Sequence, residues 1–231
     1  MRIPGLFAND IDDIVAGFES IFGNEEQPVW ETKEALHGDE KRLIIPGFIE
    51  QSPALAPLQH DPRVVGVVKS ILGPDYIWSS SDGNLFYCES YWHPDDYAAP
   101  LHHYHVKLSF YLDDLSGDNG AIRIIPGSHF HQQTFSRTLR KNFKDESGVE
   151  EIYGMASGEI PSITVSSKPG DLILIDFLTL HSSGINISKR TRWSMQYRYF
   201  DMNHITGINI GWKGVSNNLK LMDVHPELIV K

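Results

Sequence analysis

The chain has 231 residues, a formal net charge of −10 and 41% hydrophobic residues. This length is sufficient for one domain with a substantial core, and the composition is ordinary for a globular protein. The negative charge argues against unspecific binding to nucleic acid. The single cysteine, Cys88, excludes an intramolecular disulfide framework, and no membrane span or secretion signal is visible. We therefore expect a cytoplasmic protein without a nucleic-acid or membrane partner.

Two amphipathic helices are expected before the strands begin. The first covers about residues 9–22 and is closed by Gly23. The second has Asp61 as its N-cap, Pro62 at its first position and Gly73 as its stop. Its buried face is expected to consist of aliphatic side chains, namely Val64, Val65, Val68, Ile71 and Leu72. Helices of this kind are expected to buttress a sheet.

From Tyr76 onward, short apolar or alternating runs between Gly, Pro, Asn and Asp residues predict strands. The predicted fold class is mainly β with flanking helices, as a double-stranded β-helix, that is, a jelly-roll or cupin-like barrel. We expect one domain over residues 1–231, with a helical N-terminal buttress at about 1–75 and a barrel core at about 76–200. A charged insertion at about 130–162 is interpreted as a lid over a binding site, with a solvated surface excursion as the alternative.

The segment Trp92-His93-Pro94-Asp95 is the first candidate for a chemical site. Residues two apart on an extended strand point to the same face, so His93 and Asp95 can converge on one metal ion. Two histidines and one carboxylate are typical of non-haem Fe(II) sites. His181 is the candidate third ligand, because it follows an apolar run, 171–180, that is expected to be a strand. The cluster of His102, His103 and His105 is a rival ligand set.

The segment 106–129 holds Asp118-Asn119-Gly120 and ends in Ile-Pro-Gly-Ser-His. Together with the preceding Trp-His-x-Asp motif and the later Pro-Gly-Asp, His181 and Arg192, it resembles the phytanoyl-CoA dioxygenase family of Fe(II)- and 2-oxoglutarate-dependent oxygenases. The resemblance covers about residues 84–200. It implies an oxidoreductase that uses Fe(II), 2-oxoglutarate and O₂. The implied reaction is hydroxylation of an unactivated C–H bond of a small molecule from a biosynthetic or catabolic pathway, with release of succinate and CO₂.

The same resemblance implies roles for individual residues. His93, Asp95 and His181 would be the iron ligands, and Arg192 would bind the distal carboxylate of 2-oxoglutarate. Ser183 matches a position that often helps to hold this carboxylate. A guanidinium group suits the role because it can hold a carboxylate bidentately.

Strand parity alone does not separate Arg192 from Arg190, and only the family spacing of eleven residues after His181 favours Arg192. Beyond it, polar and aromatic side chains alternate. One face would carry Arg192, Ser194, Gln196 and Arg198, and the other Trp193, Met195, Tyr197 and Tyr199. A hydrophilic barrel lining and an aromatic face on the core both account for this pattern.

Lys107 lies in a second alternating strand and shares a face with Ser109 and Tyr111. If Lys107 points inward, it needs an anionic partner such as the carboxylate of the cosubstrate or substrate. An edge-strand charge that discourages aggregation is the alternative. The candidates for lining the substrate pocket are aromatic and amide side chains, namely Asn84, Phe86, Tyr87, Trp92, Tyr104 and Asn186.

Two other classes of function are open from the sequence. One is a metal-dependent cupin-like enzyme that does not use 2-oxoglutarate, and the other is a non-catalytic small-molecule-binding barrel. Asp95 favours hydroxylation because halogenating relatives carry a small residue in place of this carboxylate. In each case the expected partner is a small molecule, and the expected state is a monomer or homodimer.

Overall fold

The computed structural model describes most of the chain up to residue 201. The described residues are 1–23, 42–74, 76–87, 90, 92–95, 105–130, 151–152, 155–156, 161–184, 186–188 and 191–201. The sequence-based interpretations of Cys88, His102, His103, Tyr104 and Arg190 lie outside these residues, as does most of the expected insertion.

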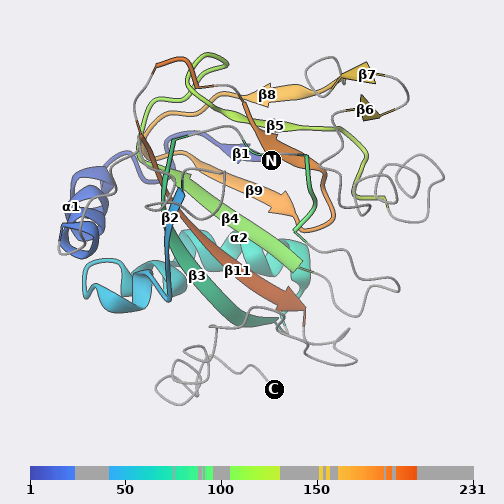
Figure 1. Cartoon of the computed structure of the whole chain (residues 1–231). Coiled ribbons are helices and arrows are strands. Elements are labelled where there is room, and N and C mark those ends of the chain that lie inside the picture. Colours follow the sequence, from blue (N-terminus) through green and yellow to red (C-terminus); the bar gives the residue numbers. More distant parts are fainter. Residues whose placement is uncertain are drawn as a thin grey trace.

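Two antiparallel sheets form the body of the molecule (Figure 1). The larger sheet has the order β1 (Arg2–Ile3), β9 (Leu172–Asp176), β4 (His105–Tyr111), β11 (Arg192–Asp201), β3 (Tyr76–Phe86) and β2 (Arg42–Pro46). The smaller sheet has the order β10 (His181–Ser183), β5 (Ile122–Ile124) and β8 (Ile163–Val165). A separate hairpin joins β6 (Glu151–Ile152) to β7 (Met155–Ala156). The mainly β class predicted from the sequence is confirmed.

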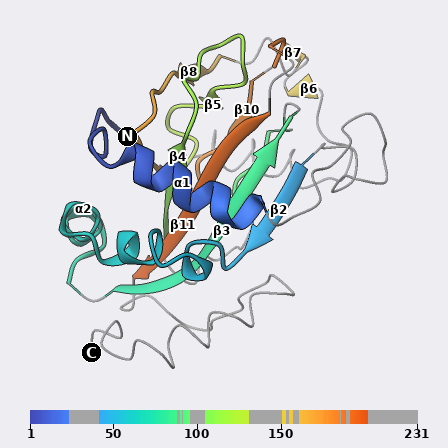
Figure 2. The ribbon, with the colours of Figure 1, turned by 90° about the vertical axis from the view of Figure 1, so that its left-hand side faces the viewer.

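Helices cover one face of the larger sheet, as Figure 2 shows. They are α1 (Ile11–Phe22), α2 (Pro62–Leu72) and the short 3-10 helices η3 (Ile49–Gln51) and η4 (Ala56–His60). Phe18 of α1 stacks on Trp193 of β11 with ring centroids 5.3 Å apart. Leu108, Phe110 and Tyr197 lie in the same core and are at most 1% exposed. The expectation that the helices buttress a sheet is confirmed.

The ends of α2 follow from its sequence. The Asp61 carboxylate accepts a hydrogen bond of 2.8 Å from the backbone N–H of Arg63, which satisfies one of the free N–H groups of the first turn. Gly73 ends the helix with φ +84°, a conformation that favours glycine. The expected buried face needs one correction, because Ile71 is 39% exposed. It lies at the margin of the stripe that Val64, Val68 and Leu72 bury.

The opposite face of the larger sheet is polar and points toward the smaller sheet. Lys107 of β4 is in register with Arg198 of β11 and with Ile175 of β9, so these residues share this face. Ile122, Ile173 and Ile175 form a small apolar cluster between the two sheets. Both explanations of the alternating pattern of β11 therefore hold. Its aromatic side chains pack in the core under the helices, and its polar side chains line the interior between the two sheets.

The first 75 residues are not only a helical buttress. Short strand β1 pairs with β9, and β2 pairs with β3, so this region supplies both outer strands of the larger sheet. Strand β4 lies between β9 and β11, so the edge-strand interpretation of Lys107 is wrong. Among the residues described, no helix combines the length and the apolar character needed to cross a membrane.

Candidate metal centre

The turn between β9 and β10 places His181. The sequence predicts one strand through 180, but β9 ends at Asp176, whose carboxylate accepts a hydrogen bond of 2.8 Å from the N–H of Leu178. The N–H of Thr179 donates to the Asp176 carbonyl at 2.9 Å. This side-chain bond favours a turn over a continued strand. The chain therefore crosses to the smaller sheet, and His181 begins β10 instead of following a long strand.

The segment that contains His93 and Asp95 pairs with this turn. His93 and His181 exchange two backbone hydrogen bonds of 3.0 Å, and the N–H of Asp95 donates to the Phe177 carbonyl at 2.9 Å. As a result, one potential ligand atom from each of His93, Asp95 and His181 lies within 4.8 Å of the others. Among the described residues, these three form the cluster of His, Cys, Asp and Glu side chains close enough to hold a metal ion.

The protonation of His181 suits a metal ligand. Its Nδ1 lies 2.8 Å from the Thr179 carbonyl, which can only accept, so Nδ1 carries the hydrogen and Nε2 keeps its lone pair. Burial lowers the pKa of His181 to about 3, and the positive charge of Lys107 acts in the same direction. The imidazole is therefore neutral at physiological pH, as metal binding requires.

Asp95 is held by a lysine. The Nζ of Lys107 lies 2.5 Å from Oδ2 of Asp95 and 3.1 Å from Nε2 of His181. Oδ1 of Asp95 lies on the His181 side, 3.8 Å from Nε2. Burial on its own would raise the pKa of Asp95, but the charges of Lys107 and of the two histidines hold it below its usual range. Lys107 therefore does point inward, and its anionic partner is a carboxylate of the chain itself.

This donor set fits Fe(II). Two imidazoles and one ionised carboxylate from one side of a site are the ligands that non-haem Fe(II) enzymes use. His181 presents an unprotonated Nε2, and Asp95 keeps its charge although its side chain is only 16% exposed. The rival position His105 is buried against the ring of Phe177, with centroids 4.5 Å apart, and does not belong to the cluster.

Arg192 lies on the same polar face as Lys107 and is 4% exposed. Its guanidinium carbon lies 4.5 Å from the centre of the Phe86 ring, and Nη1 donates to the carbonyl of Gly120. Burial raises the pKa of Tyr111, on which the charges of Arg192 and Asp95 act in opposite directions. Tyr111 is thus within electrostatic reach of both groups. Gly120 was not among the predicted site residues, although the Asn-Gly pair that forms its turn is visible in the sequence.

The other candidate residues make contacts of different kinds. The N–H of Ser183 donates to the hydroxyl of Ser90 at 2.7 Å. Asn84 is buried and donates to Asp82 at 2.6 Å on the polar face. Trp92 is buried, with the guanidinium of Arg123 5.0 Å from its ring centre.

Asn186 and Tyr87 are linked to each other. The amide of Asn186 donates to the Tyr87 carbonyl at 3.0 Å and accepts from the N–H of Ser188 at 3.1 Å. These bonds hold the loop after β10. A role of either residue in binding substrate stays a prediction.

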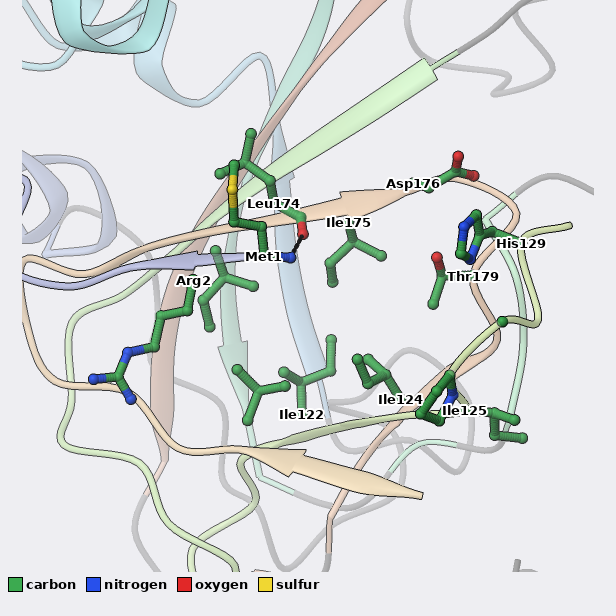
Figure 3. Close-up of a pocket in the computed structure, with 14 residues that line it drawn as sticks. Met1, Arg2, Ile122, Ile124, Ile125, His129, Leu174, Ile175, Asp176 and Thr179 are labelled. Atoms are coloured by element: carbon green, nitrogen blue, oxygen red, sulfur yellow. Dashed lines mark hydrogen bonds between the residues drawn. The ribbon is translucent and has the colours of Figure 1, made fainter. Parts of the chain in front are cut away.

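A cavity of about 490 Å³ lies between the edges of the two sheets (Figure 3). Its wall is mostly aliphatic, and His129, Asp176 and Thr179 gather at one end. The turn from β9 to β10 connects the cavity to the candidate metal centre. Thr179 lines the cavity, and its backbone carbonyl accepts the hydrogen bond from His181. The pocket candidates Asn84, Tyr87, Trp92 and Asn186 do not line this cavity.

A family model described as "Phytanoyl-CoA dioxygenase (PhyH)" matches residues 3–194. The chain belongs to the phytanoyl-CoA dioxygenase family. The match includes His93, Asp95, His181 and Arg192, and it begins further toward the N-terminus than residue 84, where the resemblance in the sequence starts. The family resemblance read from the sequence is confirmed.

Curated members of the family with similar sequences are ectoine dioxygenases. The protein of Bordetella bronchiseptica is 29% identical over 173 residues, which are 65% of this chain and 54% of the relative. The protein of Sphingopyxis alaskensis is 30% identical over 157 residues, which are 60% of this chain and 51% of the relative. The chain thus spans about half the length of these curated relatives.

Solved structures agree with the fold of this PhyH-family chain. HygX from Streptomyces hygroscopicus, solved with nickel and 2-oxoglutarate, has a TM-score of 0.68 at 17% identity. The match covers 87% of this chain and 82% of the HygX chain. The epimerase SnoN from nogalamycin biosynthesis has a TM-score of 0.66 at 18% identity, with coverages of 87% and 76%. EctD from S. alaskensis, solved with 2-oxoglutarate and 5-hydroxyectoine, has a TM-score of 0.60 at 20% identity, with coverages of 88% and 72%. The jelly-roll prediction is confirmed.

Proposed function

We propose that the chain is an Fe(II)- and 2-oxoglutarate-dependent dioxygenase that hydroxylates a small molecule and releases succinate and CO₂. The observation that carries the proposal is the convergence of His93, Asp95 and His181 in a family that matches residues 3–194. With 2-oxoglutarate, Fe(II) supplies the activation of O₂ that oxidation of an unactivated C–H bond requires. The protein's own residues bind, orient and shield the reactants.

The triad residues would hold the metal through the Nε2 of His181, a ring nitrogen of His93 and the carboxylate of Asp95. The hydrogen bond from Nδ1 of His181 to the Thr179 carbonyl at 2.8 Å fixes the ring that presents Nε2. Asp95 stays ionised through its neighbours and contributes the one negative charge of the set.

Arg192 and Ser183 would bind the distal carboxylate of 2-oxoglutarate. Arg192 is buried, and a buried guanidinium has its strongest complement in a carboxylate that meets it with two hydrogen bonds. Tyr111 is in register with Ser194, on the face of β11 that carries Arg192, and the charges of both Arg192 and Asp95 act on its pKa.

Lys107 would hold Oδ2 of Asp95, at 2.5 Å, and leave Oδ1 to the metal. An ammonium group this deeply buried also attracts a second anion, which suits the carboxylate of 2-oxoglutarate next to the metal. Lys107 would thus hold the proposed metal ligand Asp95 and also help to bind a carboxylate of 2-oxoglutarate, as the sequence suggested.

The substrate class remains that of a small molecule, and we propose a cytoplasmic reaction. Ectoine belongs in the first set of compounds to be tested, because the curated relatives are ectoine dioxygenases. The polar interior face around Asn84, Asp82 and Arg198 favours a substrate with hydrogen-bonding groups, and the aliphatic cavity favours one with an apolar part.

The proposal is tested by measuring succinate released from 2-oxoglutarate by the Fe(II)-loaded protein, alone and with each candidate substrate. We expect slow uncoupled release without substrate, faster release with the right one, and no release from His181→Ala. Metal-dependent turnover of a substrate without succinate would support the cupin-like enzyme. Bound substrate without turnover would support the non-catalytic barrel.

A further inference from the structure

The guanidinium of Arg192 lies in a narrow slot formed by two other elements. Strand β11 is paired with β3 so that Arg192 faces Phe86, and the Phe86 ring centre lies 4.5 Å from the guanidinium carbon. The second contact is the carbonyl of Gly120, which accepts a hydrogen bond from Nη1. Both contacts act on the group that would meet the cosubstrate.

No side chain fits at position 120 while Arg192 keeps this place. A Cβ atom on Gly120 would lie 2.5 Å from Nη1, 2.6 Å from Cζ and 2.8 Å from Nε of Arg192. Nonbonded heavy atoms do not approach this closely, so either the guanidinium or the turn would have to move.

The turn that carries Gly120 is firmly held. Oδ1 of Asn119 accepts the N–H of Ser116 at 2.6 Å, and the Asn119 amide donates to the Asp114 carbonyl at 2.7 Å. The N–H of Ala121 donates to the Ser116 carbonyl at 3.0 Å, and Gly120 itself has φ +87°. Because the arginine side chain is flexible and the turn is not, a methyl group at position 120 would displace the guanidinium.

We propose that Gly120 is a positioning residue that aims Arg192 at the distal carboxylate of 2-oxoglutarate. This inference rests on the proposed function. Two parallel hydrogen bonds to a carboxylate need a fixed orientation of the guanidinium plane, and a displacement of about 1 Å is enough to reduce activity about 100-fold. The absent side chain at position 120 therefore serves cosubstrate binding, in addition to the shape of the turn.

The test compares Gly120→Ala with Gly73→Ala. Gly73 has nearly the same φ angle, +84°, but a Cβ atom there would meet nothing within 4 Å. Both variants thus place a methyl group on a residue with positive φ, and only the first has this methyl group against Arg192. The readout is the dissociation constant of 2-oxoglutarate for the Fe(II)-loaded protein under anaerobic conditions, from the visible absorption of the chelated keto acid.

A second ligand separates aim from general damage. 2-Oxobutyrate has the same 2-keto acid group as 2-oxoglutarate but lacks the distal carboxylate, so its binding does not depend on Arg192. We expect Gly120→Ala to bind 2-oxoglutarate about 10- to 100-fold more weakly and 2-oxobutyrate as the wild type does. Gly73→Ala should bind both as the wild type does.

Several outcomes would overturn the inference. Unchanged binding of 2-oxoglutarate by Gly120→Ala would refute the positioning role alone, and equal weakening of both keto acids would show a merely structural role. A wild-type protein that binds iron but never 2-oxoglutarate would refute the proposed function and the inference with it. If Gly120→Ala does not fold, Phe86→Leu removes the ring that contacts the same guanidinium on its other side. This variant must then weaken the binding of 2-oxoglutarate and leave the binding of 2-oxobutyrate unchanged.

Discussion

The two faces of the larger sheet differ in chemistry although the same strands build both. In β4, Leu108 and Phe110 lie under the helices, while Lys107 faces the smaller sheet and binds Asp95. In β11, Tyr197 lies in the aromatic core, and Arg192 faces the interior. Neighbouring residues of one strand thus contribute either to the hydrophobic core or to the candidate site.

The two faces contribute separately to stability and to ligand binding. The helix-covered face buries aromatic and aliphatic surface, which is the main favourable contribution to folding. The interior face buries charges, which cost free energy unless they are paired, and their retention points to ligand binding. We therefore expect substitutions on the two faces to have distinct signatures.

The largest effect is expected for Asp95→Ala. The change removes a proposed metal ligand and leaves Lys107 buried without its carboxylate, which should cost about 3–5 kcal/mol of folding stability in metal-free buffer. Urea unfolding in the presence of a chelator measures this loss, and calorimetric titration measures metal binding. In the double variant Asp95→Ala, Lys107→Met we expect stability to recover and metal binding to stay lost. Equal stability of wild type and Asp95→Ala would show that the pair contributes nothing to the fold.

A comparable loss of stability without loss of the site is expected for Phe110→Ala on the other face. Phe110 is 1% exposed and contacts the rings of Phe7 and Tyr197, with centroids 5.1 Å and 5.2 Å away. Truncation of a buried phenylalanine costs about 3–5 kcal/mol. Below its unfolding transition, the variant should bind metal like the wild type. A selective loss of metal affinity in the folded variant would contradict the separation of the faces.

Two tyrosines in the aromatic core give a smaller and sharper contrast. The hydroxyl of Tyr199 donates to the Gln59 carbonyl at 2.8 Å, so Tyr199→Phe should cost about 1 kcal/mol. The hydroxyl of Tyr197 is buried and has no hydrogen-bond partner among the described residues, so Tyr197→Phe should be neutral or stabilising. Chemical denaturation of both variants at neutral pH measures the difference. A larger cost for Tyr197→Phe would refute this assignment.

The same tyrosines predict a loss of stability in alkali. Burial raises the pKa of Tyr197 and of Tyr199 well above the ordinary value of 10.0. The unfolded chain therefore loses these protons first, so their contribution is complete below about pH 10 and is lost as the pH rises further. The denaturant concentration at the midpoint of unfolding should decrease as the pH is raised from about 9 to about 11. The decrease should be smaller in the double variant Tyr197→Phe, Tyr199→Phe. An equal fall in both proteins would exclude these groups as the cause.

Local patterns predicted much of the fold. The caps of α2 were correct because Asp61, Pro62 and Gly73 act through their own backbone neighbourhood. The strand predicted over 171–180 was too long, because its apolar residues do not reveal that Asp176 folds back on the N–H of Leu178. Strand β1 has two residues and is defined by its pairing with β9, far along the chain.

The residue types of the candidate site could be predicted from the sequence, but the contacts between these residues could not. His93, Asp95, His181 and Arg192 came from motif order in a recognised family. The ion pair between Lys107 and Asp95 joins a strand to a separate segment, and no spacing rule gives it. The contact between Gly120 and Arg192 joins residues 72 positions apart, so the Asn-Gly pair indicated a turn and nothing about its arginine.

Anaerobic titration shows whether the polar interior face forms an iron and 2-oxoglutarate site. Fe(II) is added to the purified protein, followed by 2-oxoglutarate, and the visible spectrum is recorded. We expect a weak charge-transfer band from the chelated keto acid, absent in His181→Ala. Iron demonstrably bound to the wild type without any such band on addition of 2-oxoglutarate would show that this face does not form the proposed site.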